Sequence, residues 1–217
     1  KKARGNDKEA SAQLAMVERV LAVLGEGKPA RTMDISADDK RVFEMLHLLS
    51  GKPVLYVCNV EEDAAGEGNA QSEKVAEMAT GQGAISVVIS ARIEEEISAL
   101  GDATEQQEFL DAIGLQETGL TRVIRAGYEL LHLITFFTVG PTETRAWTVP
   151  AGSKAPQAAG AIHTDFEKGF IKAETIAYDD FIACNGEQGA KEAGKMRQEG
   201  RDYTTQDGDL MLFRFNV

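Results

Sequence analysis

The stretch Lys52-Pro-Val-Leu-Tyr-Val-Cys-Asn-Val-Glu-Glu62 decides how the middle of this chain folds. Its first seven residues are rich in β-branched and aromatic side chains, the pattern of a strand buried in an α/β sheet. Asn59 follows this run, and the carboxylate of Glu62 stands three positions further on. Open α/β sheets bind ligands at the carboxyl ends of their strands, so Asn59, Val60 and Glu62 form a candidate ligand site. The alternative is an ordinary strand-to-loop turn, in which such polar residues are common.

A second strand of the same kind is expected at residues 84–89, and it ends in Ser90-Ala91. Between the two strands, the sequence predicts an amphipathic helix from about residue 70 to residue 80. Further helices are expected at 94–100 and 105–113, with the acidic run 94–96 as a solvated first turn that suits the helix dipole. Residues 51–130 therefore form an expected α/β domain.

The first fifty residues favour antiparallel helices. One helix is expected from Lys8 to about Leu24, and another begins after Ser36, a good N-cap, and runs towards Gly51. The apolar face of the first is predicted to be formed by residues at helical spacing, namely Leu14, Val17, Leu21 and Leu24. A chain that opens on the apparent helix end at residues 1–4 suggests the end of a longer helical hairpin domain, here 1–50.

Residues 131–217 change pattern again. Strand-like runs at 130–139 and 144–149 flank Gly140-Pro-Thr-Glu143, a hairpin signal, and a small-residue helix follows at 155–161. Further strand-like segments lead to the end of the chain, so we expect an α+β domain of the ubiquitin-like β-grasp type. His47 and His132 are interpreted as structural histidines, the second within the strand, and His163 as a residue that stabilises its loop by a hydrogen bond.

The composition of the chain limits the possible functions. At 217 residues and 43% hydrophobic, it has material for two or three subdomains. No apolar run approaches the roughly 20 residues of a membrane helix, and no signal-peptide pattern opens the chain. Two distant cysteines, Cys58 and Cys184, indicate core thiols in a reducing compartment. The net charge of -12 excludes extensive wrapping of nucleic acid, and no spacing of His, Cys or Asp predicts a zinc site.

Three motifs carry a family resemblance. GTPases carry the motif Asn-Lys-x-Asp after one strand, and its Asp binds guanine. They carry a second motif, Ser-Ala-Lys, after the next strand. In this chain the corresponding segments are Asn59-Val-Glu-Glu62 and Ser90-Ala-Arg92. The first resembles the Asn-x-x-Glu variant of the YchF/Obg-like ATPases, GTPase relatives that prefer adenine. The third motif, Ile162-His-x-Asp-Phe-x-x-Gly-Phe-Ile171 followed by Asp207-Gly-Asp209, closely resembles the TGS domain that closes that family.

The resemblance covers essentially the whole chain and implies three pieces: the end of an inserted helical domain (1–50), the C-terminal part of a P-loop NTPase α/β domain (51–130) and a TGS β-grasp domain (131–217). It implies a cytoplasmic, monomeric, ribosome-associated ATPase that binds ATP, or GTP, with Mg²⁺ at full length. The nucleotide-binding residues would be Asn59, Val60, Glu62, Ser90 and Ala91, with no catalytic residue in this chain. The alternative is a non-catalytic module that binds RNA, the ribosome or a protein.

Gly189-Ala-Lys-Glu-Ala-Gly-Lys195 has the spacing of a phosphate loop, but Met196 replaces the Ser or Thr that would hold Mg²⁺. We interpret it as a charged surface helix or loop, so the chain alone is expected not to hydrolyse nucleotides. Contact with ribosomal RNA must be local, because the net charge is negative. Two sets of basic residues are candidates, namely Lys1, Lys2, Arg4 and Lys8, and Lys191, Lys195, Arg197 and Arg201.

Overall fold

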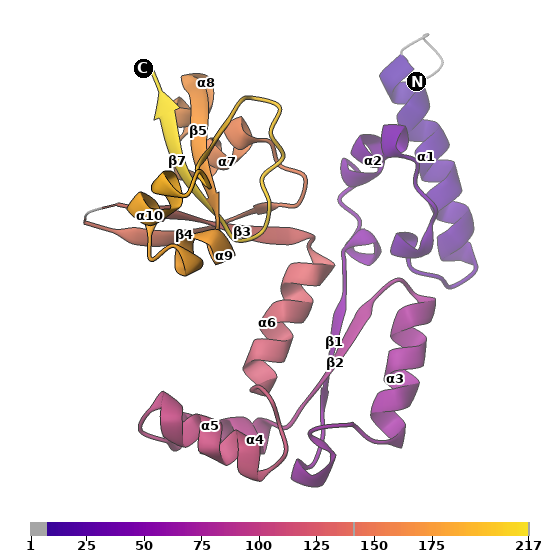
Figure 1. The fold of residues 1–217 in the computed structure, drawn as a ribbon. Coiled ribbons are helices and arrows are strands. Elements are labelled where there is room, and N and C mark those ends of the chain that lie inside the picture. Colours follow the sequence, from indigo (N-terminus) through magenta and orange to yellow (C-terminus); the bar gives the residue numbers. More distant parts are fainter. Residues whose placement is uncertain (1–7, 141, 217) are drawn as a thin grey trace. The chain divides into compact units, whose positions relative to one another are not determined.

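A computed structural model describes residues 8–140 and 142–216 of the chain. They form two compact units, which divide between Leu130 and Leu131 (Figure 1). The first unit combines a helical part with a small parallel sheet, and the second is built on a five-stranded sheet. The chain is therefore a mixed α/β protein.

The helical part of the first unit consists of two α-helices and two single turns of 3₁₀-helix. They are α1 (Lys8–Gly25), η2 (Ala30–Thr32), α2 (Ala37–Glu44) and η3 (Leu49–Gly51). Ser36 caps α2 as predicted, its Oγ accepting a hydrogen bond from the backbone N–H of Asp39 at 3.2 Å. The expectation that this helix runs towards Gly51 is wrong. It ends at Glu44, and His47 takes a left-handed conformation with φ of 48°. The early end lets Leu46 and Leu48 both reach the core against α1.

The apolar face predicted for α1 is not the one that is buried. Met16 and Val20 form the core with Ala30, whereas Leu14 and Leu21 are 50% and 61% exposed. The helix carries two apolar stripes at helical spacing, and α2 and the 3₁₀ turns cover the stripe that contains Met16. Periodicity alone does not decide between two such stripes.

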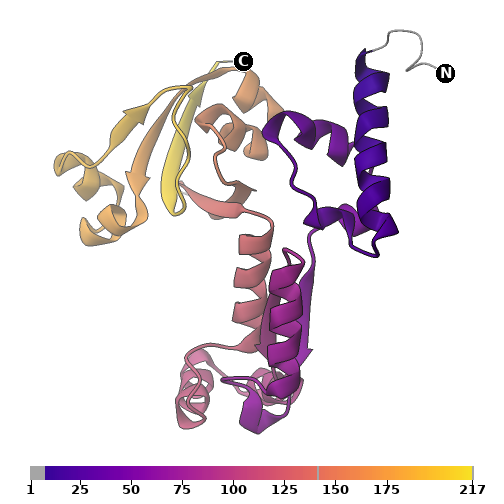
Figure 2. The ribbon, with the colours of Figure 1, turned by 90° about the vertical axis from the view of Figure 1, so that its right-hand side faces the viewer.

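The rest of the first unit surrounds a two-stranded parallel sheet. Strands β1 (Leu55–Asn59) and β2 (Ile85–Ile89) pair in register from Leu55 opposite Ile85 to Asn59 opposite Ile89. Helices α3 and α6 both pack on this sheet and lie on opposite sides of it (Figures 1 and 2). The remaining elements are η4 (Glu62–Ala64), α3 (Ala70–Gly81), α4 (Ala91–Ala99), α5 (Ala103–Ala112) and α6 (Gly119–Leu130). Helix α6 was not predicted from the sequence.

The second unit has a sheet in the order β4-β3-β7-β5-β6. Its strands are β3 (Leu133–Val139), β4 (Thr144–Pro150), β5 (Phe170–Ala177), β6 (Arg197–Glu199) and β7 (Asp209–Phe215). Its helices are α7 (Ala155–Ile162), α8 (Thr164–Lys168), α9 (Tyr178–Ala183) and α10 (Glu187–Glu192). The predicted hairpin is present as the antiparallel pair β3–β4.

Both faces of this sheet are covered. Phe136 is fully buried in a core that includes alanines of α7, and its neighbour Phe137 packs into a second core with Phe181 and Cys184. This follows from the alternation of side chains along a strand. The prediction that His132 lies within the strand is wrong. β3 begins at Leu133, and His132 has a φ of 50° and accepts a backbone hydrogen bond from Ala151 at 2.7 Å.

Both cysteines are free and half-buried. Among the helices of residues 8–140 and 142–216, none is both long and apolar enough to traverse a lipid bilayer.

Candidate functional site

The carboxyl ends of β1 and β2 bring two of the predicted motifs together. The backbone N–H of Val60 donates to the carbonyl of Ile89 at 2.9 Å, which extends the parallel pairing by one step. The side-chain oxygen of Asn59 accepts a hydrogen bond from the backbone N–H of Ala91, also at 2.9 Å. Asn59 therefore ties the first strand end to the start of α4, across 32 positions of the sequence.

Two polar groups at this junction keep hydrogen-bonding capacity that no described residue uses. The side-chain amide of Asn59 keeps its N–H groups, because the bond to Ala91 uses only the oxygen. Ser90 is 2% exposed, and its Oγ has no hydrogen-bond partner among the described residues. Buried hydroxyls without a partner are uncommon. Val60 can offer only its carbonyl, since its N–H is already engaged by Ile89.

Glu62 opens η4, three residues after the end of β1. Its carboxylate forms an ion pair with Arg92 of α4, with Oε1 lying 2.6 Å from Nε. Both side chains are substantially exposed. Arg92 was not identified from the sequence, although a cation directly after Ser90-Ala91 is a signal that could have marked it.

The loop that carries Glu62 is fixed from α6. Arg122 donates from Nη1 to the carbonyl of Ala65 at 3.0 Å. The start of α6 is held in turn by Glu94, whose two carboxylate oxygens accept from the backbone N–H groups of Gly119 at 2.6 Å and Leu120 at 3.0 Å. The interpretation of Glu94 as a solvated acidic residue is therefore wrong, because its carboxylate caps the N-terminus of another helix.

Two hollows lie near these strand ends. Asn59 and Val60 line one of them, together with other residues of β1 and with Asn69, Gln71, Ser72 and Val75. Glu62 lines the other, between the loop at 62–68 and residues 113–115. The predicted base-site residues thus come from adjoining loops, and they do not all face a single hollow in this structure.

The segment with phosphate-loop spacing forms α10 and the turn after it. The Nζ of Lys195 pairs with the carboxylate of Asp180 at 3.1 Å. A Cβ on Gly189 would lie only 1.9 Å from the carbonyl oxygen of Cys184, so this glycine permits close packing of α10 on α9. A phosphate loop instead joins a strand to a following helix and leaves its Lys free for phosphate.

The basic candidates for RNA contact differ in their surroundings. Lys1, Lys2 and Arg4 lie outside the described residues, and Lys8 is exposed at the start of α1. In the second set, Lys195 is ion-paired, and Arg201 donates to the carbonyl of Phe170 at 3.0 Å. Lys191 lies exposed on α10.

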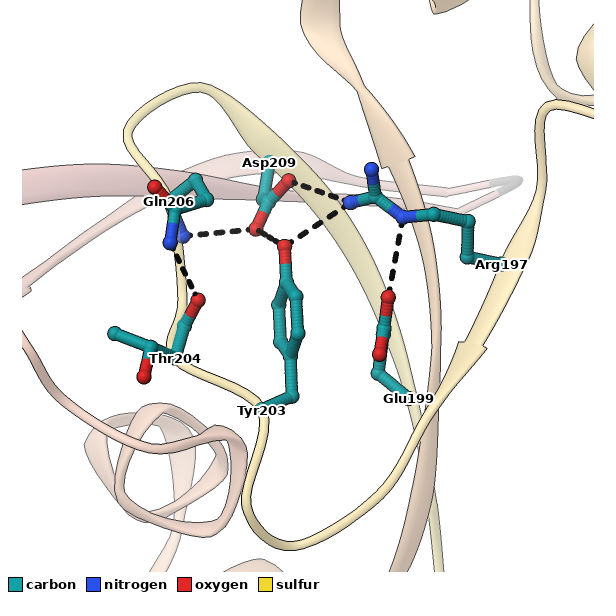
Figure 3. A network of polar contacts seen from close by, with 6 residues as sticks. All are labelled: Arg197, Glu199, Tyr203, Thr204, Gln206 and Asp209. Atoms are coloured by element: carbon teal, nitrogen blue, oxygen red, sulfur yellow. Dashed lines mark hydrogen bonds and ion pairs between the residues drawn. The ribbon is translucent and has the colours of Figure 1, made fainter.

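Arg197 belongs to a polar network around the buried Asp209 in the second unit (Figure 3). It pairs with Glu199 at 3.1 Å, and its Nη2 lies 3.0 Å from the hydroxyl of Tyr203 and 3.5 Å from Asp209. Asp209 is 2% exposed and accepts from the hydroxyl of Tyr203 at 2.7 Å and from the backbone N–H of Gln206 at 2.9 Å. Burial raises the pKa of Tyr203 well above its usual range, and the hydrogen bond to Asp209 adds to this shift.

His163 has a structural role, as predicted, but it stabilises the start of a helix and not a loop. It caps α8, with Nδ1 accepting from the backbone N–H of Asp165 at 3.2 Å. Within the part of the chain that the structure describes, no group of three or more His, Cys, Asp or Glu side chains is arranged to hold a metal ion.

Comparisons with solved structures support the fold. The chain superposes on the Schizosaccharomyces pombe YchF GTPase with a TM-score of 0.83 and 33% identity, covering 97% of this chain and 57% of that one. It also matches a GTP binding protein from Pyrococcus horikoshii OT3 with a TM-score of 0.53, covering 93% of this chain and 56% of the other. At 23% identity, this second match shows a shared fold alone. The class that emerges is a mixed α/β protein with the architecture of nucleotide-binding GTPase relatives.

The sequence comparisons are more specific. The family model described as "YchF-GTPase_C: Protein of unknown function (DUF933)" matches residues 133–216. The whole chain is 52% identical over 217 residues to the ribosome-binding ATPase YchF of Escherichia coli O157:H7 and 47% identical over 219 aligned residues to that of Bacillus subtilis. The chain belongs to the YchF family, as its motifs predicted. It spans 59% and 60% of the length of these two relatives.

Proposed function

We propose that this chain supplies the base-recognition part and a TGS-type β-grasp domain of a ribosome-associated protein that binds and hydrolyses ATP in preference to GTP. One observation carries the proposal: the Asn59 side chain bonds to the backbone of Ala91, which joins the two strand-end motifs at one place. An ordinary turn could satisfy Asn59 within its own loop, so a bond across 32 positions favours a built site. The names of the relatives, each a ribosome-binding ATPase, support the same reading.

The chemistry of base recognition follows from the available groups. The N–H groups of Asn59 can donate to N7 of a purine, and Ser90, whose buried Oγ has no partner, directly precedes Ala91 at the same strand end. The carboxylate of Glu62 can accept from an exocyclic amine. A shorter Asp placed to accept two hydrogen bonds would select guanine, and the longer Glu relaxes that selection.

We assign the binding of triphosphate and Mg²⁺ to the part of the full-length relatives that this chain does not cover. The described residues offer no phosphate loop, and no cluster among them suits a metal ion. We therefore expect the 217-residue chain alone to show no ATPase activity. Turnover by the purified chain, lost in Lys195→Ala, would show that the segment 189–195 holds phosphate after all.

The test of base recognition uses a full-length protein that contains this chain. Val60→Lys together with Glu62→Asp should shift the preference from ATP towards GTP by about tenfold, because a hydrogen bond to a charged group contributes roughly 1.5–3 kcal/mol. The measurement is the ratio of the two dissociation constants, obtained by competition with a fluorescent nucleotide. The matched control is Lys191→Ala, on α10 in the other unit. An unchanged ratio in the double variant would exclude residues 59–62 from the base site.

Binding to the ribosome is proposed to depend on local basic residues, because the chain has a net charge of -12. Each Lys or Arg that contacts a phosphate contributes close to one unit of salt dependence, so neutralising a true set of three or four should flatten log K against log salt by about 2–4 units. Lys191 is the best candidate in the second unit, since Lys195, Arg197 and Arg201 already have protein partners. If neutralising both sets changes nothing, recognition runs through protein contacts, and the non-catalytic protein-binding module becomes the better description.

A further inference from the structure

The ion pair between Glu62 and Arg92 spans the same two strand ends that Asn59 and Ala91 join. Glu62 follows β1 and opens η4, whereas Arg92 is the second residue of α4, which follows β2. The contact joins Oε1 of Glu62 to Nε of Arg92 at 2.6 Å, so one specific carboxylate oxygen is engaged. The other oxygen, Oε2, is left for a further donor.

The two purine bases make different demands on such a carboxylate. Guanine presents two adjacent donors, its ring N1–H and its exocyclic amine, which suit a carboxylate with both oxygens available. Adenine presents one donor, the exocyclic amine, and an unprotonated N1. Each carboxylate oxygen can accept two hydrogen bonds, so the bond from Arg92 acts by fixing the orientation of the carboxylate and not by exhausting Oε1. A carboxylate fixed so that it presents Oε2 alone satisfies the single donor of adenine but leaves one donor of guanine without a partner. Unpaired donors in a binding site are penalised more strongly than missing contacts.

We propose that Arg92 is a positioning residue that sets base specificity, by holding Oε1 of Glu62 and leaving Oε2 as the single acceptor for the amine of adenine. This inference rests on the proposed function, in which Glu62 faces the base. It adds a residue from the second strand end and assigns to it a role in discrimination between adenine and guanine.

The exposure of the pair separates this role from a purely structural one. The side chains of Arg92 and Glu62 are 73% and 48% exposed, and ion pairs on the surface contribute little to stability. Removing Arg92 should therefore leave the thermal unfolding of the protein almost unchanged. A change in the preference between bases would then report the position of the carboxylate.

The experiment measures ATP and GTP dissociation constants for the full-length protein by competition with a fluorescent nucleotide. Arg92→Ala releases Oε1, and we expect affinity for GTP relative to ATP to rise by about three- to tenfold. Arg92→Lys keeps a cation that can reach Glu62, so it should restore most of the original ratio. The matched control is Arg125→Ala, which removes a surface ion pair with Glu117 of 2.7 Å in the same unit and should leave the ratio unaltered.

Glu62→Gln distinguishes failure of this inference from failure of the proposed function. If Glu62→Gln changes the ratio and Arg92→Ala does not, the role of Arg92 is refuted, while Glu62 keeps its place in the base site. If neither variant changes the ratio, Glu62 does not face the base and the proposed base site fails with it. If Arg92→Ala lowers the affinity for ATP and for GTP equally, the inference is also overturned, because Arg92 would then contribute to nucleotide binding in general and not to selection between the bases.

Discussion

The two units of this protein are stabilised in different ways. The second unit has a five-stranded sheet with apolar clusters on both faces, including Phe136 and Ala173 at 0% exposure. Within residues 8–130, the first unit has a two-stranded parallel sheet and two small separate clusters, one around Met16 and one around Ile93. Parallel sheets are ordinarily buried on both faces and rarely stand as two strands.

Large apolar side chains are exposed in both units, including Ile171 and Ile182 in the second unit. The first unit exposes large apolar residues at helical spacing on α1 and α6, among them Leu21, Leu120 and Ile124, and Val57 on β1. Scattered exposed apolar residues are normal, but several on the same helix faces are typical of surfaces that contact other protein. The second unit is therefore built as a self-contained domain, whereas the first depends more on caps and loop contacts than on a closed core.

The largest expected effect tests the core of the second unit. Phe136→Ala should lower its free energy of unfolding by about 3–5 kcal/mol, because it removes a fully buried ring. The matched truncation in the first unit is Leu21→Ala, which removes a side chain that is 61% exposed and should cost less than about 0.5 kcal/mol. Urea unfolding reports the second unit through Trp147, the single tryptophan, which packs on that core. Circular dichroism follows the helices of the first unit.

A similar loss of stability from both truncations would contradict this difference between the two units. It would mean that Leu21 is buried in solution, against a surface that the described residues do not provide.

The next effect tests the network around the buried carboxylate of Asp209. Asp209→Ala should destabilise the second unit by about 2–4 kcal/mol, because the hydroxyl of Tyr203 and the backbone N–H of Gln206 lose their acceptor. The control is Asp202→Ala in the preceding loop, an exposed carboxylate whose side chain is not needed for this network. Equal effects of the two substitutions in urea unfolding would contradict a structural role for Asp209.

The sequence predicted helices and strands well where the residue pattern was compatible with one type of element. The strand before Asn59, the helix at 70–81 and the β3–β4 hairpin all appear near their expected bounds. It failed where two solutions competed, as on α1, whose two apolar stripes are equally periodic. Helix α6 was missed because its apolar residues merge with the strand-like run after Leu130.

The candidate site could be predicted only in part. The order of the motifs marked Asn59 and Ser90, because strand ends meet at one edge of a parallel sheet. The partners of Glu62 and Glu94 were not predicted, since both contacts join segments far apart in sequence and depend on tertiary packing. Three of the four basic candidates at 191–201, namely Lys195, Arg197 and Arg201, have protein partners that the charge pattern alone did not indicate.

The two units should also differ in how their stability depends on pH. The pKa of Tyr203 is raised in the folded protein above the ordinary value of about 10, so folding favours the protonated hydroxyl. This contribution is fully present below about pH 10 and is lost as the pH rises towards the folded pKa. The urea concentration at the unfolding midpoint of the second unit should therefore decrease as the pH is raised above about 10. Tyr203→Phe should reduce that fall, relative to Tyr56→Phe in the first unit. Identical pH profiles for the two variants would refute the assignment to Tyr203.

The smallest expected effect tests the cap that holds α6 in the first unit. Glu94→Gln keeps the size of the side chain but removes the charge that accepts from the N–H groups of Gly119 and Leu120. A helix cap of this kind contributes about 1 kcal/mol, so the first unit should lose roughly that much stability while the second unit is unaffected. The matched control is Glu95→Gln, the adjacent exposed carboxylate on α4. Hydrogen exchange at the first turn of α6 gives the most local readout. Faster exchange there in Glu94→Gln alone would support a first unit held by caps, whereas equal exchange in both variants would mean that packing of α6 on the sheet, not the cap, holds this end of the helix.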